Sequence, residues 1–259
     1  MSGAPRDPWF HLAQGTPARI GQGRAGVSLP TREVLSFALA HAQARDAVHA
    51  RLDADTLADE IAVLGLGTVT VESVAPERAV YLRRPDYGRR LAEESALRIS
   101  GAGRGPFDLA LVLGDGLSAT AVMRHGPAVL RSLLPHIAPM GLRLAPVAIA
   151  SGARVALGDE IGALLGARAV AVLIGERPGL SAADSLGIYL TYAPQRGRRD
   201  SERNCISNVR PEGLAPQAAA AKLAWLIDAA LTRQLTGVGL KDESEALIAD
   251  GTSQPPRVT

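Results

Sequence analysis

Cysteine is nearly missing from this sequence: Cys205 is the only one among 259 residues. A single cysteine excludes a disulfide within the chain and indicates a reducing, cytosolic setting. The sequence also lacks any run of the ~18 apolar residues needed to span a bilayer, and its first residues lack the apolar segment of a secretory signal. We therefore expect a cytoplasmic protein with no membrane contact.

Lysine and aromatic residues are also scarce. Lys222 and Lys241 are the only lysines among 28 basic residues, and 26 acidic residues leave a formal net charge of +2. So small a charge does not attract polyanions, so no nucleic-acid partner is expected. Aromatic residues make up 3% of the chain and apolar residues 47%. A globular core must therefore be built mainly from Ala, Val, Leu and Ile.

Several motifs that carry chemistry are absent. The sequence has no His-Glu-x-x-His, Cys-x-x-Cys or Gly-x-Ser-x-Gly string, which argues against a zinc hydrolase, a thiol redox enzyme and a serine hydrolase. His41 and His49 share one helical segment without a third ligand nearby, so no metal site is expected. No histidine follows Cys205, which argues against a catalytic cysteine and favours a small, buried, apolar one.

The first hundred residues are predicted to be mostly helical. Residues 1–30 form an extended arm in which Trp9 and Phe10 are apolar anchors that hold it either to a partner or, by default, to the chain's own core. Helical spacing of apolar residues continues from Thr31, a candidate N-cap, to about residue 52. A shorter helix over 55–64 and an alternating strand over 68–73 follow.

From residue 107 onward, short apolar runs alternate with helical segments. Strands are expected at residues 109–113, 141–151, 168–174, 188–192 and 205–209. Pro146 interrupts the second of these, which favours an edge position or a bulge. The alternation predicts an α/β fold with a Rossmann-like, mainly parallel sheet flanked by helices, after a mostly helical N-terminal region. The expected division is a helical domain over 1–100, an α/β domain over 101–241 and a disordered tail over 242–259.

Two turns at strand ends are candidate ligand sites. Residues 114–116, followed by Ser118, occupy the place where a Rossmann-like fold holds a phosphate, but they are not a Gly-x-Gly-x-x-Gly string. Glu176 follows a buried strand next to Gly175 and Pro178, at the sheet edge where ligands bind in α/β folds. The alternative for Glu176 is a salt bridge to Arg177 or Arg203.

Longer motifs then carry a family resemblance. In chain order these are TPARI, LPT, LAHAQARDAV, RPDYGRRL, DGLS, VALGDEIG, IGERPGL and ERNCISN. Together and in this order they resemble the light chain of ethanolamine ammonia-lyase over roughly residues 7–241. The resemblance implies an adenosylcobalamin-dependent lyase that converts ethanolamine to acetaldehyde and ammonia by a radical mechanism. It also implies a hetero-oligomer in which a large TIM-barrel subunit carries the substrate site and the catalytic groups.

The same resemblance assigns three cobalamin contacts to this chain. They are Val155 as an apolar contact, Glu176 as a hydrogen-bond acceptor and Cys205 as a contact at the rim of the corrin. A corrin has broad apolar faces edged with amides, which suits such a mixture. No Asp-x-His-x-x-Gly string occurs, so bound cobalamin is expected to keep its own benzimidazole on cobalt.

Other interpretations stay open at this stage. A nucleotide-binding oxidoreductase on a Rossmann-like sheet and a non-enzymatic scaffold or adaptor are the alternatives. The arginines between Arg83 and Arg90 fit either an anion or partner site or a solvated turn. The resemblance leaves open whether the enzyme enters a bacterial microcompartment.

Overall fold

A six-stranded mixed sheet forms the centre of the protein. The computed structural model describes residues 7, 9–103 and 105–244. The strand order is β1-β3-β2-β4-β5-β6. The strands are β1 (Thr68–Glu72), β2 (Phe107–Gly114), β3 (Val147–Ser151), β4 (Ala167–Gly175), β5 (Leu186–Tyr192) and β6 (Asn204–Val209). The first four are parallel to one another, whereas β5 is antiparallel to both β4 and β6.

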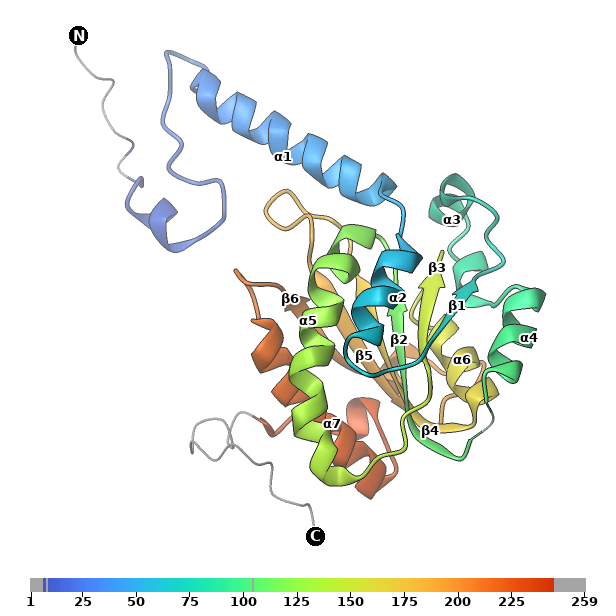
Figure 1. The fold of residues 1–259 in the computed structure, drawn as a ribbon. Helices are drawn as coiled ribbons and strands as arrows, with labels where there is room; N and C mark the ends of the chain where they lie inside the picture. The colour runs from blue at the N-terminus through green and yellow to red at the C-terminus, as the bar shows by residue number, and fades with distance from the viewer. Residues whose placement is uncertain (1–6, 8, 104, 245–259) are drawn as a thin grey trace.

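Helices cover both faces of the sheet (Figure 1). On one face pack α2 (Ala54–Ala62), α5 (Ala119–Ile137) and α7 (Pro216–Arg233), which share the larger hydrophobic cluster. On the other face pack α4 (Glu93–Gly101) and α6 (Leu157–Leu165), with a second cluster. The predicted α/β class with a mainly parallel sheet flanked by helices is confirmed.

The alternation of large and small residues in the central strand explains this layering. In β2, Leu111 and Leu113 point to the α5 and α7 face, and Val112 points to the α6 face. Successive side chains of a strand point to opposite faces, so a run of apolar residues is buried on both sides. On the α6 side a Cβ at Gly158 would lie 2.2 Å from Cγ2 of Val172. Glycine therefore lets α6 lie directly on β4.

Most predicted elements are present with shifted ends, and two details were wrong. The first long helix, α1 (Thr31–His49), has Pro30 as its N-cap, with no side-chain cap, so Thr31 is its first residue instead. β3 lies between β1 and β2, so the edge alternative for Pro146 was wrong. The bulge alternative agrees with the register, which shifts by one residue between Leu109 opposite Leu144 and Val112 opposite Ala148. β3 begins at Val147, directly after Pro146, so proline's missing N–H removes no bond of the sheet. The short α3 (Arg78–Arg83) was not predicted.

The sheet extends across the predicted domain boundary near residues 101–106. β1, from the first hundred residues, pairs with β3 over five residue pairs and forms one edge of the sheet. The division into two domains stays a prediction. At the other end, Asp242 pairs with Lys222 of α7 at 2.9 Å. The rest of the predicted tail, residues 245–259, lies outside the described residues.

The N-terminal arm and α1 extend away from the body of the protein (Figure 1). Trp9 is 62% exposed and Leu35 is 64% exposed. The expectation that Trp9 packs on the chain's own core was therefore wrong: its side chain lies outside that core. The arm touches the body through Arg19, whose Nη2 donates to the carbonyl of Leu180 at 3.2 Å. In the described part of the chain, no helix is both long enough and apolar enough to cross a membrane.

Candidate functional site

The carboxyl ends of β2 and β3 are joined by a buried carboxylate. The chain leaves β2 toward α5 on one face and β3 toward α6 on the other, which is the kind of crevice where α/β folds bind ligands. Asp115 fills it: its oxygens accept hydrogen bonds from the backbone N–H groups of Gly152 at 3.0 Å and Ala153 at 2.8 Å. Arg78 Nη1 lies 3.0 Å from Asp115 Oδ2. Burial raises the pKa of Asp115, and the charge of Arg78 opposes that rise.

The candidate phosphate turn after β2 is used by the protein itself. Ser118 is the N-cap of α5: its Oγ accepts from the N–H of Ala121 at 3.3 Å and donates to the carbonyl of Ala183 at 2.9 Å. A Cβ at Gly116 would lie 2.2 Å from the carbonyl oxygen of Gly175. The start of α5 is thus capped and covered by the loop after β4. This arrangement counts against a phosphate site and against the nucleotide-binding alternative.

Three separate contacts hold the segment that carries Val155. Besides Asp115, the hydroxyl of Tyr81 donates to the carbonyl of Ala153 at 2.8 Å, and the N–H of Arg154 donates to the carbonyl of Gly88 at 2.7 Å. Val155 itself is half-buried and packs against the hydrophobic cluster on the α6 face. The backbone around this predicted contact is therefore fixed, with α6 beginning two residues later.

Gly88 belongs to the arginine-rich turn between Arg83 and Arg90, whose charged side chains mostly face solvent, as expected of a solvated turn. Arg84 pairs with Asp86 at 2.7 Å, and both side chains are more than half exposed. Arg84 also stacks on Tyr87, 4.2 Å from the ring centroid. The turn therefore contributes to the Val155 segment through its backbone.

Glu176 joins the ends of three strands. It follows β4, and its carboxylate accepts hydrogen bonds from the hydroxyls of Ser185 and Ser207 and from the N–H of Asn208. A Cβ at Gly187 of β5 would lie 3.0 Å from Glu176 Oε1, so glycine leaves room for the carboxylate to lie over β5. Arg203, offered as an alternative partner, instead donates to Asp159.

Cys205 is exposed, so the expectation of a buried cysteine was wrong. The physical reason is its place on β6, the edge strand, whose contacting helix α7 lies on the opposite face. Cys205 is directly opposite Tyr189 of β5. Partial burial of the thiol raises its pKa, and the charge of Glu176 adds to the rise, while hydrogen bonding with Tyr189 and Ser207 opposes it.

The structure brings Glu176 and Cys205 together and places Val155 on the same face. Cys205 and Ser207 alternate with the buried Ile206, so they point to the α6 face, where Glu176 lies. Ser207 was not predicted as a partner of Glu176. The available signal was the spacing of Cys205 and Ser207, which puts both side chains on one face of a strand.

A separate cavity of about 820 Å3 opens beside Asp115, between the end of α1 and the ends of β1 and β3. Arg78 and Tyr81 also line it, but the three predicted cofactor contacts are not among its lining residues. Within the described ranges, no group of three or more His, Cys, Asp or Glu side chains is arranged to hold a metal ion. The predicted contacts thus define a candidate site apart from this cavity, on the sheet surface around Glu176 and Cys205.

This architecture defines an α/β protein with Glu176 and the exposed Cys205 near one edge of the sheet and an N-terminal arm that extends from the body. By sequence, the chain belongs to the ethanolamine ammonia-lyase light chain family, which it matches over residues 6–241.

Curated relatives agree over nearly the whole chain. The ethanolamine ammonia-lyase small subunit of Rhodopseudomonas palustris (strain BisA53) is 56% identical over 229 residues, covering 88% of each chain. That of Bradyrhizobium diazoefficiens is 53% identical over 254 residues, covering 97% of each chain. That of Azotobacter vinelandii is 51% identical over 261 residues, covering 98% of this chain and 96% of the relative. The predicted family is confirmed.

Proposed function

We propose that this chain is the small subunit of an adenosylcobalamin-dependent ethanolamine ammonia-lyase and helps to bind the cobalamin at its interface with a large subunit. The observation that carries the proposal is that Glu176 is bonded to Ser207, on the same face of β6 as the exposed Cys205. When bound, adenosylcobalamin supplies the radical chemistry that turns ethanolamine into acetaldehyde and ammonia.

The residues around Glu176 fit an amide-rimmed corrin. Glu176 offers carboxylate oxygens to the amide or hydroxyl donors of the cofactor, and the exposed Ser207 and Asn208 add polar groups at the same place. Val155 supplies an apolar contact on the same face. Fixed donors and acceptors beside apolar surface are what a large, mostly apolar cofactor requires. The role of these residues is to hold and orient the corrin and to exclude water from it.

The partner in this proposal is a large subunit that carries the substrate site. Exposed apolar side chains on the arm and α1 fit a surface that a partner covers, because such clusters mark interaction sites. They are Trp9, Phe10, Leu12, Ile20, Val27, Leu29, Val34, Leu35, Phe37 and Leu39. No catalytic acid or base is assigned to this chain.

The test is cobalamin affinity in the assembled complex. Glu176→Ala is expected to raise the dissociation constant for adenosylcobalamin by roughly tenfold, the effect of losing one hydrogen bond to a buried polar group. Glu60→Ala, at an exposed glutamate of α2 on the opposite face of the sheet, is the matched control. Equal affinity of the Glu176→Ala and unsubstituted complexes would remove Glu176 from the site.

The two alternatives give different results. A nucleotide-binding oxidoreductase would quench the fluorescence of added NADH, which the capped turn at Ser118 argues against. A scaffold or adaptor would bind its partner equally well with and without cobalamin. The proposed small subunit instead shows tighter association with the large subunit when cobalamin is present, because the cofactor contacts both.

A further inference from the structure

The side chains of Arg203 and Asp159 form a buried ion pair on the α6 face. Arg203 Nη1 donates to Asp159 Oδ1 at 2.6 Å, and Nη2 donates to Oδ2 at 2.7 Å, so both carboxylate oxygens are engaged. The two side chains are only 2% and 1% exposed. Removing two charges from water is costly, and an apolar pair of similar volume is often as stable. The pair therefore suggests a role in fixing geometry.

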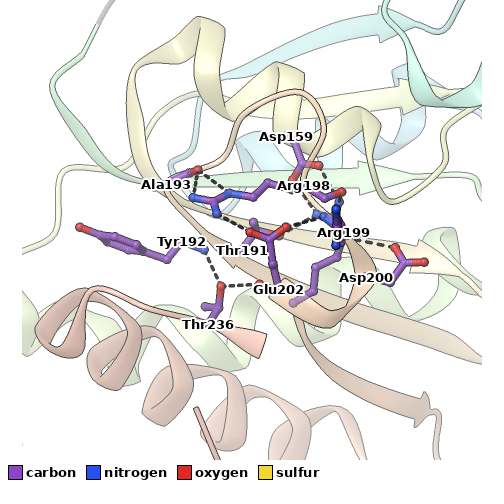
Figure 2. Close-up of polar contacts among 10 residues, drawn as sticks. Asp159, Thr191, Tyr192, Ala193, Arg198, Arg199, Asp200, Glu202 and Thr236 are labelled. Atoms are coloured by element: carbon purple, nitrogen blue, oxygen red, sulfur yellow. Dashed lines mark hydrogen bonds and ion pairs between the residues drawn. The ribbon is translucent and has the colours of Figure 1, made fainter. Parts of the chain in front are cut away.

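Further contacts surround the guanidinium. Arg203 Nη1 also donates to Thr191 Oγ1 at 2.9 Å, and Nη2 donates to the carbonyl of Arg198 at 3.0 Å. Asp200 Oδ1 lies 3.6 Å from Nε. Figure 2 shows Asp159 and Thr191 close to the link between β5 and β6, residues 193–203, which carries Arg198 and Arg199. One side chain thus connects α6, β5 and the link between β5 and β6.

The pair connects the segments that carry two of the proposed cofactor contacts. Asp159 lies in the first turn of α6, four residues after Val155. Arg203 precedes β6 directly and lies two residues before Cys205, on the same side of the extended chain. β6 is the edge strand, and in the described residues β5 is its only paired neighbour in the sheet order. An edge strand with one neighbour opens more readily than an inner one, so a second attachment matters there.

We propose that Arg203 and Asp159 are positioning residues: their ion pair holds the strand that carries Cys205 at a fixed place relative to the segment that carries Val155. Neither side chain is accessible to a ligand, so neither is a binding residue. The role of the pair in cofactor binding rests on the proposed function. Its role in positioning β6 is a property of this chain alone.

The backbone N–H groups where β6 pairs with β5 report that positioning, because β6 is the edge strand of the sheet. The first measurement is the rate of hydrogen exchange of the β6 segment in the full chain, well below the unfolding temperature, because amides bonded between the two strands exchange only when β6 opens. Asp159→Asn leaves the guanidinium without its carboxylate partner, so the rate is expected to rise about tenfold as β6 opens more often. If the pair only added global stability, its loss would lower the unfolding temperature and leave this rate unchanged.

Two further variants keep the test interpretable. Arg203→Lys retains a positive charge but not the two-pronged geometry, so it is expected to fold and to raise the rate by a smaller factor. Asp108→Asn is the control, because Asp108, at the start of β2, pairs with Arg168 and Arg143 and not with α6 or β6. Its rate is expected to equal that of the unsubstituted chain. An unchanged rate in both Arg203→Lys and Asp159→Asn would overturn the proposal.

The second measurement separates this proposal from the proposed function. In the complex with the large subunit, Asp159→Asn is expected to raise the adenosylcobalamin dissociation constant about tenfold, and Asp108→Asn to leave it unchanged. If Glu176→Ala weakens binding and Asp159→Asn does not, the positioning role in cofactor binding is wrong and the proposed function stands. If the unsubstituted complex binds no cobalamin, the proposed function is wrong, and the hydrogen-exchange rates of β6 still decide whether the pair positions that strand.

Discussion

The carboxylate of Glu176 accepts a hydrogen bond from the backbone N–H of Asn208 at 3.2 Å, which ties the end of β4 to the end of β6. β5 runs between these two strands, and Gly187 provides the space through which the side chain passes. A single acidic side chain therefore connects the loop after β4 with the strand that carries Cys205.

The first prediction concerns the titration of Cys205. Partial burial raises its pKa, and the negative charge of Glu176 raises it further. The pH profile of thiol modification should therefore have its midpoint above the value of about 8.5 for a free thiol. Glu176→Gln removes the charge, which lowers the pKa, so the thiolate forms at lower pH and the profile shifts to lower pH. Glu160→Gln, a change of the same charge on α6, serves as the control and should give a smaller shift.

The second prediction concerns Asp115. Asp115→Asn places an amide N–H2 where the carboxylate accepted hydrogen bonds and leaves Arg78 without its counter-charge. Breaking a buried pair in this way is expected to lower the free energy of unfolding by about 3–5 kcal/mol, measured by urea denaturation. Asp86→Asn removes an exposed carboxylate from Arg84 and should leave the urea midpoint unchanged. Equal midpoints for the two variants would contradict the anchoring role of Asp115.

The third prediction concerns the contact between α6 and β4. Alanine normally favours a helix over glycine, but a Cβ at Gly158 would lie 2.2 Å from Val172. The overlap is expected to outweigh the helix preference, so Gly158→Ala should lower the free energy of unfolding by about 1–3 kcal/mol. Gly101 in α4 has no atom within 4 Å of its added Cβ. Gly101→Ala should therefore be neutral or stabilising by up to about 1 kcal/mol.

The fourth prediction concerns the exposed apolar side chains of α1. Phe37 is 47% exposed, and Phe37→Asp should leave the unfolding temperature of the isolated chain nearly unchanged. It should weaken association with the large subunit by roughly tenfold or more, because a charge would be buried at the interface. Leu97→Asp on α4 introduces the same charge at a 69% exposed position and is the control. Unimpaired association of the Phe37→Asp chain would show that α1 lies outside the interface.

The strands were predictable because their apolar runs are nearly continuous, as the fully buried middle of β2 illustrates. The order of strands was not, since β1 joins β3 across a stretch of about 75 residues and no local pattern encodes that pairing. Pro146 shows what a local signal can and cannot predict about a strand. Its missing N–H correctly signalled an interruption, but the interruption was the start of an inner strand.

The sequence by itself determined the family, the α/β class and the stretch from Val170 to Val209 that presents Glu176 and Cys205, because these depend on composition, periodicity and motif order. Only the tertiary structure decided which side chains meet. It exposed Cys205 on an edge strand, paired Arg203 with Asp159 and joined Glu176 to Ser207. Those contacts link residues more than thirty positions apart, and their partners are chosen by how the sheet and α6 pack.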